Sequence, residues 1–164
     1  MIRDSIDQRI EQWAGERPDL DFSGLSSVLR IQLTAKFLTQ GAERSLAALN
    51  MKLWEYEVLS VLRRQGPPFQ LLVTEIAKAS MVTSAAVTSR IDRLEAKQLV
   101  KRKPKSDDRR AVSVSLTAKG RDLINRALEA RVKVADDLMA ALTERDREIL
   151  SAKLRKILVL HDYS

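Results

Sequence analysis

Apolar residues recur with a helical period along most of the chain. In residues 1–21, isoleucines and a tryptophan follow one another at steps of four, four and three, which predicts a short amphipathic helix. A longer helix is expected from Ser23, acting as its N-cap, to Leu49, and Asn50 is suited to the left-handed conformation that ends helices. The apolar face of this long helix is so broad that we expect a second surface to bury it.

Shorter helices are expected next, over residues 53–64, 74–79 and 84–97. The last of them should begin at Thr83, whose hydroxyl is suited to an N-cap. Val87, Ile91 and Leu94 are spaced to share one face of this helix, so we expect them in the core. The opposite face carries mostly small and polar side chains, which predicts that it is exposed.

The period then changes from helical to twofold. Residues 111–116 alternate small or polar with apolar side chains, which predicts a strand half exposed to water. The polar residues 101–110 are expected to form a turn that joins this strand to a shorter one at about 99–103. Two helices close the chain, the first capped by Thr117 and the second opened by a capping box at 143–146. The expected fold is mainly α with a two-stranded β hairpin.

Composition excludes several classes of chemistry. The chain has no cysteine, and its one histidine is His161, so thiol chemistry, histidine-pair zinc sites and a Ser-His-Asp triad have no support. Its five glycines are too dispersed for a phosphate-binding loop. We therefore expect no enzyme, no cofactor and no metal. No apolar stretch predicts a membrane span or a signal peptide, so a cytoplasmic protein without membrane contact is expected.

Positive charge is concentrated in one window. The net charge is +7, and between Arg90 and Arg110 nine basic residues stand against four acidic ones, which places +5 in this window. A short helix, a turn, a second helix and a basic hairpin make a winged helix-turn-helix. In that arrangement the second helix enters the major groove of double-stranded DNA, and the hairpin, or wing, follows phosphates or the minor groove. The alternative is an ordinary exposed helix followed by a solvated basic loop.

The residues of this window resemble those of MarR-type transcriptional regulators. The resemblance is carried by the stretches 81–100, 107–110 and 116–120 and covers residues 23–164. It implies a homodimer in which the first helix and the last two helices of each subunit intertwine. It also implies that Asp108 holds Arg110, which reaches the minor groove. With the exposed helix face, the expected DNA-contacting residues are Ser84, Thr88, Ser89, Arg93, Lys103, Lys105, Asp108, Arg109 and Arg110.

A narrower resemblance concerns a ligand. Residues 13–21 and 66–69 are similar to the urate-responsive branch of that family, and the similarity implies a ligand site formed by Trp13, Glu57, Arg90 and Arg102. Glu57 stands where that branch has aspartate. By spacing alone, Glu57 and Arg90 border the inward faces of their helices, so they could pair across a crevice. The alternative is that Trp13 only packs and that Glu57 and Arg90 form a structural salt bridge.

These observations predict a winged helix-turn-helix domain over 51–117, a helical dimerisation region over 22–50 and 118–164, and an extra N-terminal helix over 1–21. The expected function is that of a repressor that binds a palindromic operator as a homodimer. A small planar anionic ligand such as urate would release it. Two alternatives stay open: the same scaffold could respond to an aromatic carboxylate or phenolic compound, or the protein could be a ligand-independent architectural DNA-binding protein.

Overall fold

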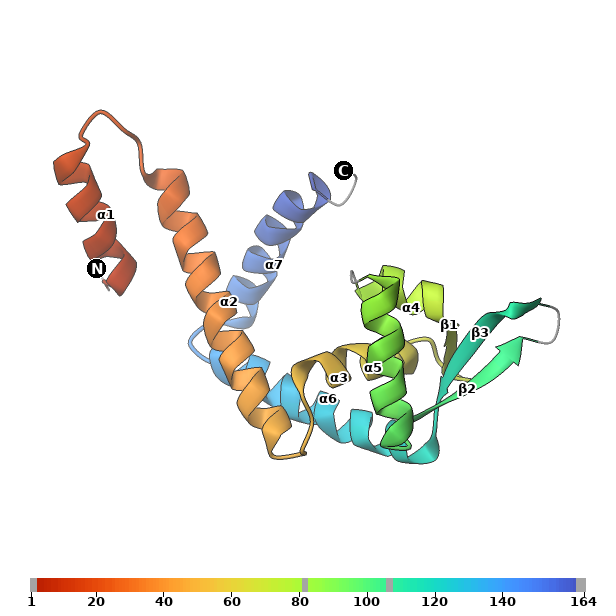
Figure 1. The fold of residues 1–164 in the computed structure, drawn as a ribbon. Helices are drawn as coiled ribbons and strands as arrows, with labels where there is room; N and C mark the ends of the chain where they lie inside the picture. The colour runs from red at the N-terminus through yellow and green to blue at the C-terminus, as the bar shows by residue number, and fades with distance from the viewer. Residues whose placement is uncertain (1–2, 81–82, 106–107, 162–164) are drawn as a thin grey trace. The chain divides into compact units, whose positions relative to one another are not determined.

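The computed structural model describes residues 3–80, 83–105 and 108–161, and over these it has seven helices and three strands (Figure 1). The helices are α1 (Ser5–Glu16), α2 (Ser23–Ala47), α3 (Leu53–Arg63), α4 (Val73–Ser80), α5 (Ser84–Ala96), α6 (Ala118–Leu138) and α7 (Glu144–Val159). The strands are β1 (Gln70–Leu72), β2 (Val100–Lys105) and β3 (Asp108–Leu116). This confirms the expected mainly α fold. The chain divides into two units, Met1–Gly41 and Ala42–Ser164.

The first unit holds α1 and most of α2. Asp4 caps α1, because its carboxylate accepts hydrogen bonds from the backbone N–H groups of Ile6 and Asp7. Arg30 of α2 joins the two helices: its Nε lies 2.8 Å from Asp4 Oδ2, and its Nη2 lies 2.6 Å from Asp7 Oδ1. A helix thus stands where the apolar pattern of residues 1–21 predicted one.

The predicted ends of α2 need correction. Ser23 is its first helical residue and not its N-cap. The carboxylate of Asp21 instead accepts hydrogen bonds from the backbone N–H and from the hydroxyl of Ser23, both at 2.9 Å. The helix ends at Ala47, two residues before the predicted end, because Leu49 and Asn50 already form a turn. Asn50 has φ +51°, so its left-handed conformation is confirmed.

The second unit encloses the hydrophobic core. Val87, Ile91 and Leu94 of α5 are fully buried, as their spacing predicted. They pack in one cluster with buried side chains of α3, α4 and α6, among them Val58, Leu59, Leu62, Ile76 and Ile124. This packing buries the apolar face of α5 and leaves its polar face directed outward.

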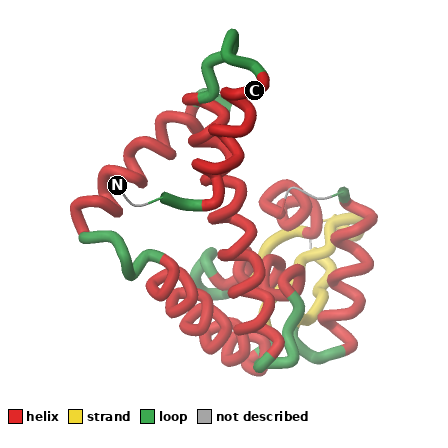
Figure 2. The backbone as a smooth tube through the Cα atoms, turned by 90° about the vertical axis from the view of Figure 1, so that its left-hand side faces the viewer, coloured by secondary structure: helices red, strands yellow, loops and turns green. Residues whose placement is uncertain are grey.

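The sheet has three antiparallel strands in the order β1-β3-β2, and Figure 2 shows them in yellow beside helices of the second unit. The prediction of a two-stranded hairpin missed β1, which is only three residues long and pairs with residues 113–115. The polar stretch predicted as a turn is largely strand, since pairing extends to Lys105 and Asp108. Charged side chains are compatible with β2 because Lys101 and Lys103 are exposed to water, while Arg102 pairs with carboxylates.

Three predicted helix starts are confirmed. The hydroxyls of Thr83, Thr117 and Thr143 each accept a hydrogen bond from a backbone N–H three residues on. Asp146 completes the capping box of α7, and its carboxylate accepts from the hydroxyl and the backbone N–H of Thr143. These two hydrogen bonds hold the pKa of Asp146 below its usual value.

Several large apolar side chains remain exposed on each of α2, α6 and α7. They are Leu25, Val28, Ile31 and Phe37 on α2, Leu128 and Val132 on α6, and Ile149, Leu150, Ile157, Leu158 and Val159 on α7. No residue of α7 is buried within this single chain. Despite this apolar surface, none of the described helices has the combination of length and unbroken apolar sequence that crossing a membrane requires.

Candidate nucleic-acid interface and adjacent cavity

The outer face of α5 is available to a large partner. α4 packs against α5, and Thr83 begins the second helix, as in a helix-turn-helix. Thr88, Ser89 and Arg93 are exposed on α5. Two of them are small and hydroxylated, so a helix carrying them approaches base edges closely. The side chain of Ser84 lies outside the part that the structure describes.

The wing carries exposed cations beside this helix. Lys101 and Lys103 are exposed on β2, while Arg102 between them is only 27% exposed. This alternation is that of a strand whose two faces have different surroundings. The other predicted wing contacts lie outside the described side chains, so they stay predictions: Lys105, Asp108, Arg109 and Arg110.

Arg102 binds α5. Its Nη1 lies 2.5 Å from Asp92 Oδ1 and 3.0 Å from Glu95 Oε2, and its Nη2 donates to the Thr88 carbonyl at 3.3 Å. The backbone N–H of Arg102 also donates to Glu95, at 3.0 Å. The sequence prediction assigned this arginine to a ligand, whereas the structure surrounds it with oxygen atoms of the neighbouring helix.

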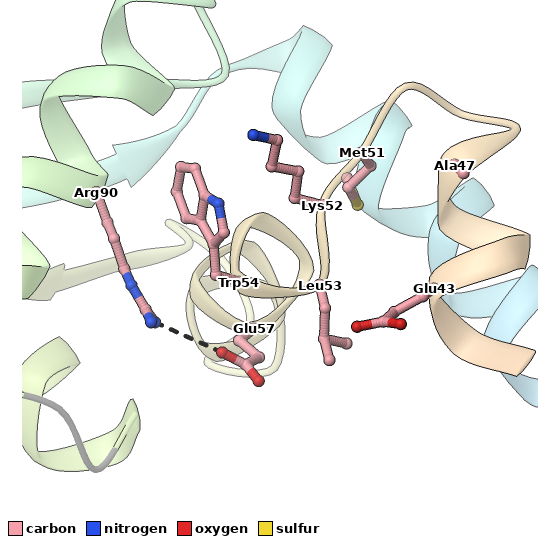
Figure 3. Close-up of a pocket in the computed structure, with 8 residues that line it drawn as sticks. All are labelled: Glu43, Ala47, Met51, Lys52, Leu53, Trp54, Glu57 and Arg90. Carbon is pink, nitrogen blue, oxygen red and sulfur yellow. Dashed lines mark hydrogen bonds and ion pairs between the residues drawn. The ribbon is translucent and has the colours of Figure 1, made fainter. Parts of the chain in front are cut away.

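A cavity of about 570 Å³ lies between the end of α2, the start of α3, and α5 (Figure 3). Its lining residues are Glu43, Ala47, Met51, Lys52, Leu53, Trp54, Glu57 and Arg90. Arg90 Nη1 lies 3.5 Å from Glu57 Oε2, so the structure pairs these two side chains as their spacing predicted. The Arg90 guanidinium also lies 5.9 Å from the centre of the Trp54 ring. The cavity therefore combines an aromatic face with charges of both signs.

Of the four predicted ligand residues, only Glu57 and Arg90 line this cavity. Trp13 belongs to the first unit, where it is 55% exposed, and its role stays a prediction. The prediction overlooked Trp54 and Lys52 as site residues. A signal for Trp54 was present, because it stands three residues before Glu57 and so shares its side of α3.

A buried carboxylate, also overlooked, joins α3 to the far end of α5. Glu55 is 2% exposed, and its Oε1 lies 2.6 Å from Nζ of Lys97. Its other oxygen accepts the backbone N–H of Lys52 at 2.8 Å. Glu55 thus caps the start of α3 and fixes the C-terminal end of α5. By contrast, the Glu57–Arg90 contact is longer and more exposed.

Comparison with known proteins supports the same interpretation. The MarR family model matches residues 52–112. The chain is 30% identical over 148 residues to the HTH-type transcriptional regulator PecS of Dickeya dadantii. This match spans 90% of this chain and 89% of PecS.

Two solved structures share its fold. A mutant MarR from E. coli, complexed with operator DNA, has a TM-score of 0.72 and 24% identity and covers 84% of this chain and 97% of its own. BpsR of Bordetella bronchiseptica, whose DNA binding is regulated by 6-hydroxynicotinic acid, has a TM-score of 0.68 and 24% identity. It covers 82% of this chain and 98% of its own. The match to PecS over nearly the whole chain, with the family model over α3 to the wing, shows that the protein belongs to the MarR family of non-enzymatic, DNA-binding winged helix-turn-helix transcriptional regulators.

Proposed function

We propose that the protein is a ligand-responsive repressor that binds a palindromic operator as a homodimer. The observation that carries this proposal is the exposed face of α5 next to the exposed lysines of β2. A helix presenting hydroxyl groups suits the major groove, and lysines beside it suit the adjacent phosphates. The complex of the E. coli relative with operator DNA supports the same use of this fold.

Homodimerisation is supported by the apolar residues left exposed on α2, α6 and α7. Within a single chain α7 has no buried side chain, so its leucines and isoleucines stay in contact with water, which is unfavourable. A second copy would cover these faces over the proposed dimerisation region, 22–50 and 118–164. The domain over 51–117 would then be presented twice, with the two copies of α5 about 34–36 Å apart, one turn of DNA.

The cavity beside α5 supports a small planar anionic ligand such as urate. Its anionic oxygens would bind Arg90, its ring N–H groups would donate to Glu57, and its face would stack on Trp54. Such a ligand would compete for the 3.5 Å contact between Glu57 and Arg90. Because that contact joins α3 to α5, its replacement would shift the DNA-contacting helix and lower affinity for the operator.

An aromatic carboxylate is the second candidate, favoured by the apolar lining from Met51 and Leu53 and by the regulation of BpsR by a hydroxynicotinic acid. The two ligand classes differ in whether their rings carry N–H groups, which would donate hydrogen bonds to Glu57. A thermal-melting screen of oxopurines against benzoates separates them, since a ligand that binds the folded state raises the melting temperature.

The test is a mobility shift on a duplex that the wild-type protein enriches from a random library. Urate at millimolar concentration should release this duplex from wild-type protein and should act weakly on Arg90→Gln. Lys103→Gln is the matched control, which should bind DNA less tightly and keep its response to urate. If no duplex is enriched, or if the protein sediments as a monomer, the proposal is wrong. If no oxopurine or aromatic acid weakens binding, only its ligand part is wrong.

A further inference from the structure

We propose that Arg102 is a positioning residue that fixes the wing against α5, so that both DNA-contacting elements move as one body. This inference rests on the proposed function, because it assumes that α5 and the wing bind DNA together. It assigns to Arg102 a role that acts through α5 and needs no contact with the ligand or with the bases.

The contacts of Arg102 follow one side of the helix. Thr88, Asp92 and Glu95 stand at intervals of four and three residues, so they lie above one another along two turns. The guanidinium reaches all three, through the Thr88 carbonyl and the two carboxylates. The backbone N–H of Arg102 adds a fourth link, to Glu95. One residue of β2 thereby fixes the direction of the strand relative to the helix.

Arg102 differs from its neighbours on the strand because its charge is paired with carboxylates. Its side chain is 27% exposed and its guanidinium lies against two carboxylates, whereas Lys101 and Lys103 are exposed. The two acids neutralise Arg102, so it adds little to the positive field that attracts phosphates. The negative charge of Asp92 and Glu95 itself opposes DNA binding. The two acids should therefore weaken DNA binding through their charge and favour it by positioning Arg102. This opposition makes the proposal testable.

Specific binding needs this alignment more than non-specific binding does. Base contacts by α5 and backbone contacts by the wing must form at the same time on the operator. Non-specific binding depends mainly on the number of phosphates neutralised and tolerates a misaligned wing. Loss of the clamp formed by Arg102, Asp92 and Glu95 should therefore lower the ratio of operator affinity to non-specific affinity.

The experiment compares Arg102→Gln with the double variant Asp92→Asn/Glu95→Gln, by fluorescence anisotropy at fixed salt. The probes are the enriched duplex and an unrelated duplex of equal length. Both variants should lose about tenfold in affinity for the enriched duplex, the size of one charge-assisted hydrogen bond, and much less for the unrelated one. Lys101→Gln is the control, which removes an exposed cation from the same strand and should weaken binding to both duplexes alike.

Three results would overturn the proposal. The first is tighter binding of both duplexes by the double variant, as expected if its acids act only by charge. The second is unchanged operator affinity of Arg102→Gln together with loss of its urate-induced rise in melting temperature, as expected of a ligand contact. The third is equal loss of affinity for both duplexes in a variant that melts well below wild type.

Arg102→Lys keeps a single-point contact with the acids, so its affinity for the enriched duplex should fall between those of wild type and Arg102→Gln. If wild-type protein enriches no duplex at all, the proposed function itself has failed.

Discussion

Alanine at position 120 would place its Cβ 1.9 Å from the carbonyl oxygen of Leu99 and 2.9 Å from the carbonyl carbon. The distance to the oxygen is far inside the roughly 3.3 Å at which a carbon and a carbonyl oxygen come into contact. Gly120 is buried in the first turn of α6, and the atoms opposite it are backbone, which does not move aside as a flexible side chain does. The Leu99 carbonyl also accepts hydrogen bonds from the backbone N–H and the hydroxyl of Thr117, at 3.1 and 3.2 Å.

The size of the effect follows from three contributions. Overpacking of this kind costs about 1–3 kcal/mol. Displacing the Leu99 carbonyl weakens two hydrogen bonds, each worth about 1 kcal/mol. Alanine regains at most about 1 kcal/mol through its higher helix propensity. Gly120→Ala should therefore lower the free energy of unfolding by about 2–4 kcal/mol.

Urea unfolding followed by circular dichroism measures this change, at one protein concentration because dimerisation would contribute to stability. Gly15→Ala is the matched control, since Gly15 lies near the end of α1 with no atom within 4 Å of the added Cβ. It should gain up to about 1 kcal/mol. A Gly120→Ala protein as stable as wild type would refute the packing of α6 against the turn before β2.

Other substitutions test the α3 contact, the cap of α7 and the wing. Glu55→Gln removes the buried partner of Lys97 and should lower the free energy of unfolding by about 1–3 kcal/mol in the same urea assay, with no change if the pair is absent. Thr143→Ala removes the cap of α7 and should cost about 1 kcal/mol, seen as an earlier loss of helical signal on heating. Lys103→Ala should weaken binding to every duplex and reduce the slope of log affinity against log salt by about 0.9, whereas an unchanged slope would exclude a phosphate contact.

The helices were predictable because their signals are local. Val87, Ile91 and Leu94 recur at helical spacing, and Thr83 stands where a hydroxyl caps a helix. Both features depend only on residues within one or two turns, so tertiary contacts had little to overrule. The same holds for the caps at Thr117 and Thr143.

The sheet was harder to predict because its strands are defined by their partners. β1 is three residues long, too short to show a period of two, and it becomes a strand only by pairing with β3. The charged residues of β2 and β3 were predicted as turn because they carry no apolar alternation. Pairing along the hairpin, which no single segment encodes, extends both strands through them.

Charge pairing marks the limit of sequence reasoning at the site. Asp92 and Glu95 counted only as acids offsetting a basic window, because spacing along α5 does not tell which cation lies opposite. The turn at residues 97–99 brings β2 alongside α5 and places Arg102 against both acids. One arginine of the basic window is thereby neutralised within the fold, while Lys101 and Lys103 on the same strand remain exposed. Net charge therefore located the surface that we propose binds DNA, but only the tertiary structure distinguishes exposed cations such as Lys101 and Lys103 from a paired one such as Arg102.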